Sequence, residues 1–342
     1  MAENQESDKN FETDNFSMSI VQKIESSINK WTAKYLLRSS DGHFIECVLL
    51  RYTKSILDST EIISLCVSSQ IGCNVKCTFC ATGKDPFVRN MSTREIIEQF
   101  LIVQKDLDMT WSGVKINGIA FMGMGEPLLN YSTVIEAIKL FKKDSRYCNI
   151  HFSLSTSGIP NKIYSLADEN LEIALFFSLH ATTDEDRRKI IPRIVFKIDD
   201  LLCALDYYTE KNPSNEPIVV TYLLLKGVND SSEDAKRLSI LLRNRNFKVS
   251  LRMYCDTNTK ELEPSELKSV ISFRDILKKN SIECGIYQSL GTDVLAGCGQ
   301  LRQRTMLERH DVKSPLTDLQ NTFLWKARDM ISTSYSMIKN KK

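Results

Sequence analysis

Residues 72–83 read GCNVKCTFCATG, and this loop contains three cysteines in a C-x-x-x-C-x-x-C spacing: Cys73, Cys77 and Cys80. Iron–sulfur clusters normally take four cysteine thiolates, so three thiolates on one loop would leave the fourth iron of a cubane [4Fe–4S] cluster open to a small molecule. Zinc usually takes four protein ligands or paired C-x-x-C modules, and the neighbouring sequence offers neither. A chance grouping of structural cysteines is the alternative. The loop therefore predicts an iron–sulfur cluster with one open iron.

The aromatic residue Phe79, just before the last cysteine, makes this loop resemble the signature of radical S-adenosylmethionine enzymes. The resemblance implies two cofactors, a [4Fe–4S] cluster and S-adenosylmethionine, whose amino and carboxylate groups chelate the open iron. Reductive cleavage of S-adenosylmethionine would then yield a 5′-deoxyadenosyl radical, which the protein must direct at its substrate.

Strand-like apolar runs alternate with amphipathic helical segments from about residue 43 onward. Such alternation predicts parallel βαβ units with right-handed crossovers. Counting from the cysteine loop, about six βα units fit, which is too few for a closed eight-fold barrel. We therefore expect an α/β fold, a partial (βα)6 radical-SAM barrel that is open and TIM-like, with a short N-terminal β extension and a C-terminal helix. The strand-like runs are Phe44–Leu50, Ile62–Val67, Ile116–Phe121, Ile150–Leu154, Ile173–Leu179, Ile218–Leu225, Val249–Tyr254 and Ile282–Tyr287.

Helix start signals and amphipathic patterns lie between these runs. Ser92-x-x-Glu95 and Thr133-x-x-Glu136 each predict a capping box at the start of a helix. Residues 232–245 and 265–279 have the periodicity of amphipathic helices. The expected domains are a disordered or helical N-terminal segment (1–33), an N-terminal β extension (34–66), a radical SAM core (67–304) and a C-terminal helical tail (305–342).

The composition, with 42% hydrophobic and 26% charged residues among 342, is typical of a globular protein. A net charge of +2 gives no global sign of nucleic-acid binding. An RNA contact would need local basic clusters, for which a solvated surface is the alternative. No apolar run reaches the roughly 18 residues of a membrane span, the N-terminus has no signal-peptide pattern, and ten cysteines favour a reducing cytoplasm. The candidate clusters are Arg187, Arg188, Lys189 and Arg193, and Arg302, Arg304 and Arg309.

Polar motifs follow four of the predicted strands at their carboxyl ends, where ligands bind in barrels of this kind. They are the cysteine loop, GMGE ending at Glu126, STSG beginning at Ser155, and His180. In GMGE, Gly125 lets the backbone approach a ligand closely, and Glu126 can accept a hydrogen bond from an ammonium group. A simple turn is the alternative for this motif.

Two further cysteines stand out. Cys66 lies seven residues before Cys73, and Cys298 lies between Gly297 and Gly299, which offer little side-chain packing. A flexible cysteine flanked by glycines is a candidate nucleophile. A buried small hydrophobe is the alternative, and we accept that alternative for Cys47, Cys148, Cys203 and Cys284.

Six segments, in this order and spacing, resemble the RlmN/Cfr family of radical methyltransferases, from about Lys34 to Arg304. They are CVSSQIGCNVKCTFCATG, FMGMGEPLLNY, LSTSGIP, FSLHA, LLKGVNDS and GTDVLAGCGQL. Members of this family methylate a ring carbon of a 23S ribosomal RNA adenosine, and RlmN members also act on certain transfer RNAs. The resemblance implies the same reaction here, with RNA as substrate, an electron donor such as flavodoxin or ferredoxin, no membrane and a monomeric chain.

The resemblance also implies roles for single residues. Cys298 would carry the methyl group on its sulfur, Cys66 would later form a disulfide with Cys298 and release the product, and Glu46 would accept a proton. For His180, a satisfied polar residue at a strand end is the alternative. The residues implied to bind S-adenosylmethionine are Gly125, Glu126, Pro127, Ser155, Ser157, Ser178, Leu179, His180 and Cys255.

The chain departs from the family pattern in three places. Only about 33 residues precede the first matching strand, where the family usually has an accessory helical domain that helps to grip RNA. Cys255-Asp256 stands where the family has Asn-Pro, and Ile191–Ile194 lacks the asparagine of the expected Met-Pro-Ile-Asn turn. These departures leave two alternatives open: a paralogue with the same chemistry on another RNA or a small heteroaromatic substrate, and a non-catalytic RNA-binding protein with a vestigial cluster.

Overall fold

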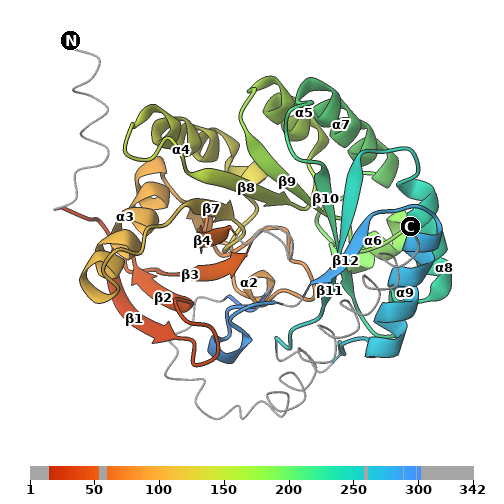
Figure 1. Cartoon of the computed structure of the whole chain (residues 1–342), viewed down its shortest axis with the longest axis horizontal. Coiled ribbons are helices and arrows are strands. Elements are labelled where there is room, and N and C mark those ends of the chain that lie inside the picture. Colours follow the sequence, from red (N-terminus) through yellow and green to blue (C-terminus); the bar gives the residue numbers. More distant parts are fainter. Residues whose placement is uncertain (1–14, 54–59, 258–260, 288, 298, 302–342) are drawn as a thin grey trace, which may run out of the picture. The chain divides into compact units, whose positions relative to one another are not determined.

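The computed structural model describes residues 15–53, 60–257, 261–287, 289–297 and 299–301 (Figure 1). These residues form a ten-stranded sheet in the order β1-β2-β3-β4-β7-β8-β9-β10-β11-β12. Neighbouring strands are antiparallel from β1 to β4 and parallel from β4 to β12. The strands are β1 (Ser19–Glu25), β2 (Ala33–Arg38), β3 (Phe44–Thr53), β4 (Glu61–Cys66), β7 (Gly118–Phe121), β8 (His151–Thr156), β9 (Ile173–Ser178), β10 (Ile218–Leu224), β11 (Phe247–Met253) and β12 (Cys284–Tyr287), with a separate pair of β5 (Gln70–Ile71) and β6 (Arg89–Asn90).

Most of the helices that connect the parallel strands follow the outer side of the curved sheet in Figure 1, whereas α2 (Ala81–Lys84) lies near the middle of the view. Six crossovers lead from β4 through to β12, each containing at least one helix. The expected α/β architecture, a partial barrel of about six βα units, is therefore confirmed. The helices are α2 (Ala81–Lys84), α3 (Thr93–Thr110), α4 (Tyr131–Lys143), α5 (Pro160–Asp168), α6 (Asp184–Ile190), α7 (Ile198–Lys211), α8 (Ser232–Leu241) and α9 (Leu267–Lys279), with 3-10 turns η1 (Pro127–Asn130) and η2 (Thr292–Val294).

The core lies between the parallel strands and their helices. Parallel strands are covered on both faces, which explains why they read as apolar runs in the sequence. Helices α3 and α4 cover β7 and β8 through aromatic packing, with the rings of Phe100 and Phe141 edge-to-face at 5.2 Å and Phe141 against Phe152 at 6.0 Å. Within the described part of the chain, none of the helices combines the length and apolar character that a membrane crossing requires.

The N-terminal part of the sheet differs from the sequence-based expectation. Residues 1–33 are expected to be disordered or helical, but Ser19–Glu25 forms β1, paired antiparallel with β2. The prediction is wrong for these residues because β1 is an edge strand in which Ile20 and Val21 are exposed and Lys23 is half-buried, so its sequence lacks the apolar alternation that marks a strand with one buried face. Residues 1–14 and the expected tail, 305–342, lie outside the described residues.

One of the two predicted capping boxes is present. The Ser92 hydroxyl accepts from the Glu95 N–H at 3.2 Å, and the Glu95 carboxylate accepts from the Ser92 N–H at 2.8 Å. The second is wrong, because α4 begins at Tyr131 and Thr133 already lies inside it. The preceding turn η1 runs directly into α4, so the chain enters this helix without a Ser or Thr cap.

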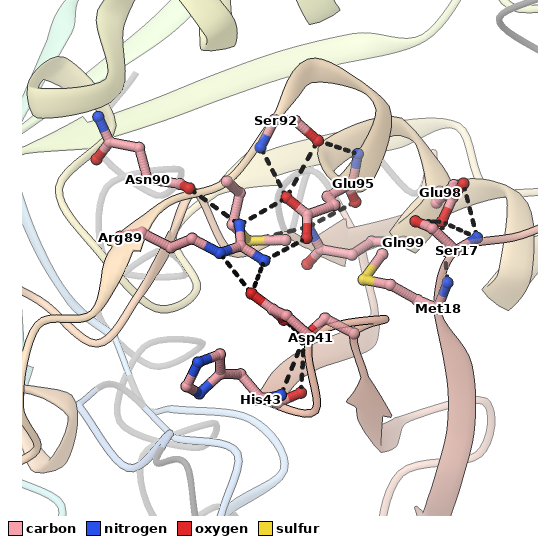
Figure 2. A network of polar contacts seen from close by, with 12 residues as sticks. Ser17, Met18, Asp41, His43, Arg89, Asn90, Ser92, Glu95, Glu98 and Gln99 are labelled. Carbon is pink, nitrogen blue, oxygen red and sulfur yellow. Dashed lines mark hydrogen bonds and ion pairs between the residues drawn. The ribbon is translucent and has the colours of Figure 1, made fainter.

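The capped end of α3 is also tied to the β2–β3 turn by an ion-pair network (Figure 2). Arg89 lies between two carboxylates, with Nη2 2.8 Å from both Glu95 Oε1 and Asp41 Oδ2. Burial works to raise the pKa of Glu95, but hydrogen bonds from Arg89 and Ser92 outweigh it and lower that pKa. The pKa of Asp41 is lowered first by a hydrogen bond from Ser39 and then by Arg89, against burial.

We therefore expect Arg89→Met to lower stability in a pH-dependent way. Carboxylates with lowered pKa values contribute stability above their unfolded pKa, about 4, and lose that contribution as the pH falls through the folded value. Thermal unfolding should thus separate the variant from wild type at pH 7, by about 1 kcal/mol for a partly exposed network. The two proteins should become equally stable as the pH falls below the lowered pKa values of Glu95 and Asp41. Arg274→Met, which removes a pair with the adjacent Asp275 on α9, is the control. A stability difference between Arg89→Met and wild type that persists unchanged at low pH would contradict the ionic account.

Candidate active site

The described candidate residues gather where the parallel strands end. The three cysteines lie between β5 and α2, just beyond the end of β4. Gly125 and Glu126 follow β7, Ser155 lies in the last part of β8, and Ser178 ends β9. His180 and Cys255 lie just beyond β9 and β11. Because parallel strands end on the same edge of a sheet, these residues share one face of the partial barrel. Cys298 lies outside the described residues.

The cysteine loop has the donors that an iron–sulfur cluster requires. Cys73, Cys77 and Cys80 are half-buried. Burial and then the nearby Cys80 thiol raise the pKa of Cys73 to about 12, and burial, Cys80 and Cys73 raise that of Cys77. Three crowded thiolates would repel one another without a cation between them, and coordinated iron supplies that charge, because a coordinating thiol is deprotonated outright. As the described side chains stand, no three His, Cys, Asp or Glu residues form a metal-binding group. The donor set nevertheless fits the cluster.

The cysteine loop is held in place by contacts with distant segments. The backbone N–H of Thr78 donates to the Ile190 carbonyl at the end of α6, at 3.0 Å. The N–H of Ala81 donates to the Gly299 carbonyl at 2.7 Å, and the hydroxyl of Thr82 donates to the Leu301 carbonyl at 2.6 Å. The chain on the C-terminal side of position 298 therefore lies against the cysteine loop.

The Gly-Glu motif needs its glycine. Gly125 has φ +101°, and a Cβ there would lie 2.6 Å from Cβ of Gln70. The buried Glu126 carboxylate accepts hydrogen bonds from Thr156 Oγ1 and from the Ser157 N–H, each at 2.7 Å. Burial raises the pKa of Glu126, and these hydrogen bonds oppose that rise. The carboxylate therefore joins the ends of β7 and β8 on the face that the other candidate residues share. Pro127 follows as the first residue of η1.

His180 is largely a structural residue. Its backbone is left-handed, with φ 58°, and its Nδ1 accepts from the N–H of Leu223 at 3.0 Å. Burial and the Arg187 cation lower the pKa of His180 to about 3, so the imidazole is neutral and its proton is on Nε2. The ring packs edge-to-face on Phe79 of the cysteine loop at 4.9 Å. The imidazole thus links β10 to the cysteine loop. Nearby, the hydroxyls of Ser155 and Ser178 lie 3.4 Å apart.

Cys66 and Cys255 lie beside the segment that contains position 298. Cys66, at the end of β4, packs on a small apolar cluster formed by Val48, Met124, Val294, Ala296 and Leu301. A Cβ placed on Gly297 would lie 3.0 Å from Cys255 Sγ. Two thiols from opposite parts of the sheet therefore border the described neighbours of position 298.

Sequence reasoning missed the buried partner of Glu46. Lys34 Nζ lies 3.2 Å from Glu46 Oε1, and both side chains have 0% exposure. Lys34 also donates to the Leu295 carbonyl at 3.1 Å. A signal existed, because Lys34 and Glu46 are charged residues in otherwise apolar runs. Lys34 on β2 does not lie directly opposite Glu46 on β3, because the register partner of Glu46 is Leu36. The ion pair is therefore diagonal across the two strands.

Arg187 corrects the expectation of a basic surface cluster. Its side chain is 1% exposed, so it cannot contact a bulky substrate from the surface. Its guanidinium donates to the backbone carbonyls at the ends of β8 and β9. The missed signal was helical spacing, because Arg187 lies three residues before the buried Ile190 on the same face of α6. Arg188 is exposed, and Arg302, Arg304 and Arg309 lie outside the described residues.

Comparison with known proteins identifies the family of the chain. Residues 67–238 match the Radical SAM superfamily. The chain is 40% identical over 291 residues to a probable dual-specificity RNA methyltransferase RlmN of Dictyoglomus turgidum, covering 84% of this chain and 80% of that one. It is 41% identical over 293 residues to the protein of the same name from Pseudothermotoga lettingae, covering 85% and 81%. A radical SAM methyltransferase from Sphaerobacter thermophilus has a similar structure, with a TM-score of 0.78, 30% identity and coverage of 84% and 82%.

Proposed function

We propose, from the premise that this chain belongs to the RlmN family of radical SAM RNA methyltransferases, that it methylates a ring carbon of adenine in RNA through a methyl-carrying cysteine. The substrate proposed is 23S ribosomal RNA, with transfer RNA as a second substrate. The observation that carries the proposal is the packing of Cys66 on the same apolar cluster as Val294, Ala296 and Leu301, which flank position 298 in the sequence.

The proposed chemistry divides between cofactors and side chains. The [4Fe–4S] cluster and S-adenosylmethionine, when bound, supply the methyl group and a radical that can remove hydrogen from an unactivated carbon. Cys73, Cys77 and Cys80 would hold the cluster, and Glu126 would orient the amino group of S-adenosylmethionine.

Three residues of the chain would handle the methyl group and the base. Cys298 would hold the methyl carbon as a thioether, and Glu46 would accept the proton that leaves the ring carbon. The Cys66 thiolate would then attack the Cys298 sulfur, so that a disulfide forms as the bond between that sulfur and the transferred carbon breaks. The carbon would keep the electron pair of that bond and take up a proton, which makes it the methyl group of the product. The Lys34 ammonium, 3.2 Å from Glu46, favours the carboxylate form that a proton acceptor requires.

Three further properties belong to this proposal. The electron donor would be a small redox protein such as flavodoxin or ferredoxin, and the enzyme would act as a monomer. The cytoplasm would be its compartment, in keeping with the ten cysteines of the chain, three of them grouped in one loop. Three exposed residues of the predicted basic cluster remain candidate phosphate contacts: Arg188 and Lys189 on α6, and Arg193, which donates to Asn74 of the cysteine loop.

Mass spectrometry of protein purified without oxygen tests the mechanism. Wild type should carry one added methyl group on the peptide containing Cys298, and Cys298→Ala should carry none. Cys66→Ala should accumulate an adduct with RNA, because the step that releases the product is missing. The attached oligonucleotide would identify the target. Cys284→Ala, which changes a half-buried thiol at β12, is the control.

Other outcomes would count against parts of the proposal. A methylated Cys298 without any RNA adduct in Cys66→Ala would favour a paralogue that acts on a different substrate. An unmethylated Cys298 in protein with a full cluster would contradict the two-thiol mechanism itself.

A further inference from the structure

Arg187 is a buried cation at the centre of the candidate site. Its side chain, on α6, is 1% exposed, and no carboxylate among the described residues forms an ion pair with it. A buried charge without a partner is costly unless other groups compensate it. The groups around the guanidinium therefore indicate which kind of ligand the site binds.

The donors of the guanidinium are only partly used. Nε donates to the Leu179 carbonyl at 3.2 Å, and Nη2 donates to the Ser178 carbonyl at 3.2 Å and to the Ser157 carbonyl. These acceptors belong to three of the residues that the family resemblance implies in S-adenosylmethionine binding. Nη1 is buried and has no hydrogen-bond partner in the described structure. An arginine has five N–H donors, so both donors of Nη1 are left over.

The position of Arg187 limits what Nη1 can meet. The guanidinium lies over the ring of Phe177, 5.6 Å from its centroid, and its electrostatic neighbours include Cys77 of the cysteine loop and the Glu126 carboxylate. The end of α6 accepts a hydrogen bond from Thr78 of that loop. Backbone carbonyls hold one side of the guanidinium, and the cysteine loop lies beside it.

We propose that Arg187 Nη1 donates a hydrogen bond to an anionic acceptor of the bound cofactors, which makes Arg187 a positioning residue of this site. The acceptor is either a sulfur of the cluster, with Cys77 as its nearest protein ligand, or the carboxylate of S-adenosylmethionine. Both acceptors are anionic, and a charge-assisted hydrogen bond to either satisfies a donor that is otherwise buried and unpaired. The inference rests on the cofactor pair and not on the methyl-cysteine step, so each can fail without the other.

Two measurements on cluster-loaded protein distinguish the acceptors. Arg187→Met removes charge and donors at similar length, and Arg187→Gln restores neutral donors if the methionine variant does not fold. The midpoint potential of the cluster, measured without S-adenosylmethionine, reports on a cluster acceptor. The Kd of S-adenosylmethionine for the oxidised protein, from equilibrium titration, reports on a carboxylate acceptor. Arg188→Met is the matched control. Arg188 is the exposed neighbour of Arg187 in the sequence, and its Nε donates to the Asp184 carbonyl within α6.

If a cluster sulfur is the acceptor, loss of the donor should make the midpoint potential of the cluster more negative. The expected change is about 59 mV for one electron, which corresponds to a tenfold change in the reduction equilibrium. If the carboxylate is the acceptor, the Kd should rise about tenfold or more, with the potential unchanged. Arg187→Lys should recover part of either effect. A folded, loaded variant whose potential matches wild type and whose Kd is within twofold would overturn the proposal. Methylation of Cys298, measured separately, tests the proposed function and is independent of these readouts.

Discussion

Cys77→Ala is expected to abolish both the iron–sulfur absorbance and RNA methylation, leaving no product above background. Cys77 lies in the middle of the cysteine loop, where burial and the thiols of Cys80 and Cys73 raise its pKa. Two remaining thiolates cannot replace a three-cysteine ligand set, and without the cluster no radical forms. Loss of one of the three cysteine ligands should therefore abolish activity and not merely reduce it. Absorbance of reconstituted protein and a methylation assay under anaerobic conditions measure the two losses.

Cys148→Ala is the matched control for this prediction. Cys148 is exposed, and not the buried small hydrophobe expected from the sequence, and its thiol donates to the nearby Ser145 carbonyl. Colour and activity should therefore stay at wild-type values. Because metal binding contributes to folding, thermal unfolding of the two variants should be compared in the apo form. A Cys77→Ala protein that remains brown and active would exclude this loop as the cluster site.

Lys34→Met is expected to give the largest loss of stability, about 3–5 kcal/mol. The reason is that Glu46 and Lys34 are both fully buried with 3.2 Å between their charged atoms. Removal of the ammonium leaves a carboxylate that must remain charged without its cation or take up a proton. Urea unfolding at pH 7 measures the loss. Lys115→Met, which removes an exposed pair with Asp108, should cost less than about 1 kcal/mol.

The double variant Lys34→Met/Glu46→Leu separates stability from chemistry. Replacing both members of a buried ion pair by apolar side chains is often neutral or stabilising, so most of the lost stability should return. The double variant should nevertheless show no methylation if Glu46 is the proton acceptor. An active double variant would rule out that role, and a Lys34→Met protein as stable as wild type would show that the pair contributes nothing to folding.

The parallel core was predictable because its signals are local. Runs such as Ile173–Leu179 are apolar except for Ser178, as expected for strands covered on both faces, and the structure places β9 at Ile173–Ser178. The cysteine loop needs only eight consecutive residues, from Cys73 to Cys80, to bring three thiols onto one loop. In contrast, the edge strand Ser19–Glu25 was missed, since an edge strand facing solvent needs no apolar pattern.

The reading of a sequence establishes which residues are close along the chain, and for this protein that was enough for the fold class and for placing the cysteine loop and the Gly-Glu motif beyond the ends of strands. The burial and pairing of its charged side chains could not be predicted in this way. Arg187 reads as one of several surface cations, but packing of α6 against the ends of β8 and β9 buries it. Lys34 meets Glu46 only through the register of β2 on β3. Burial and pairing of charges depend on contacts between segments far apart in the sequence, and these exist only in the folded chain.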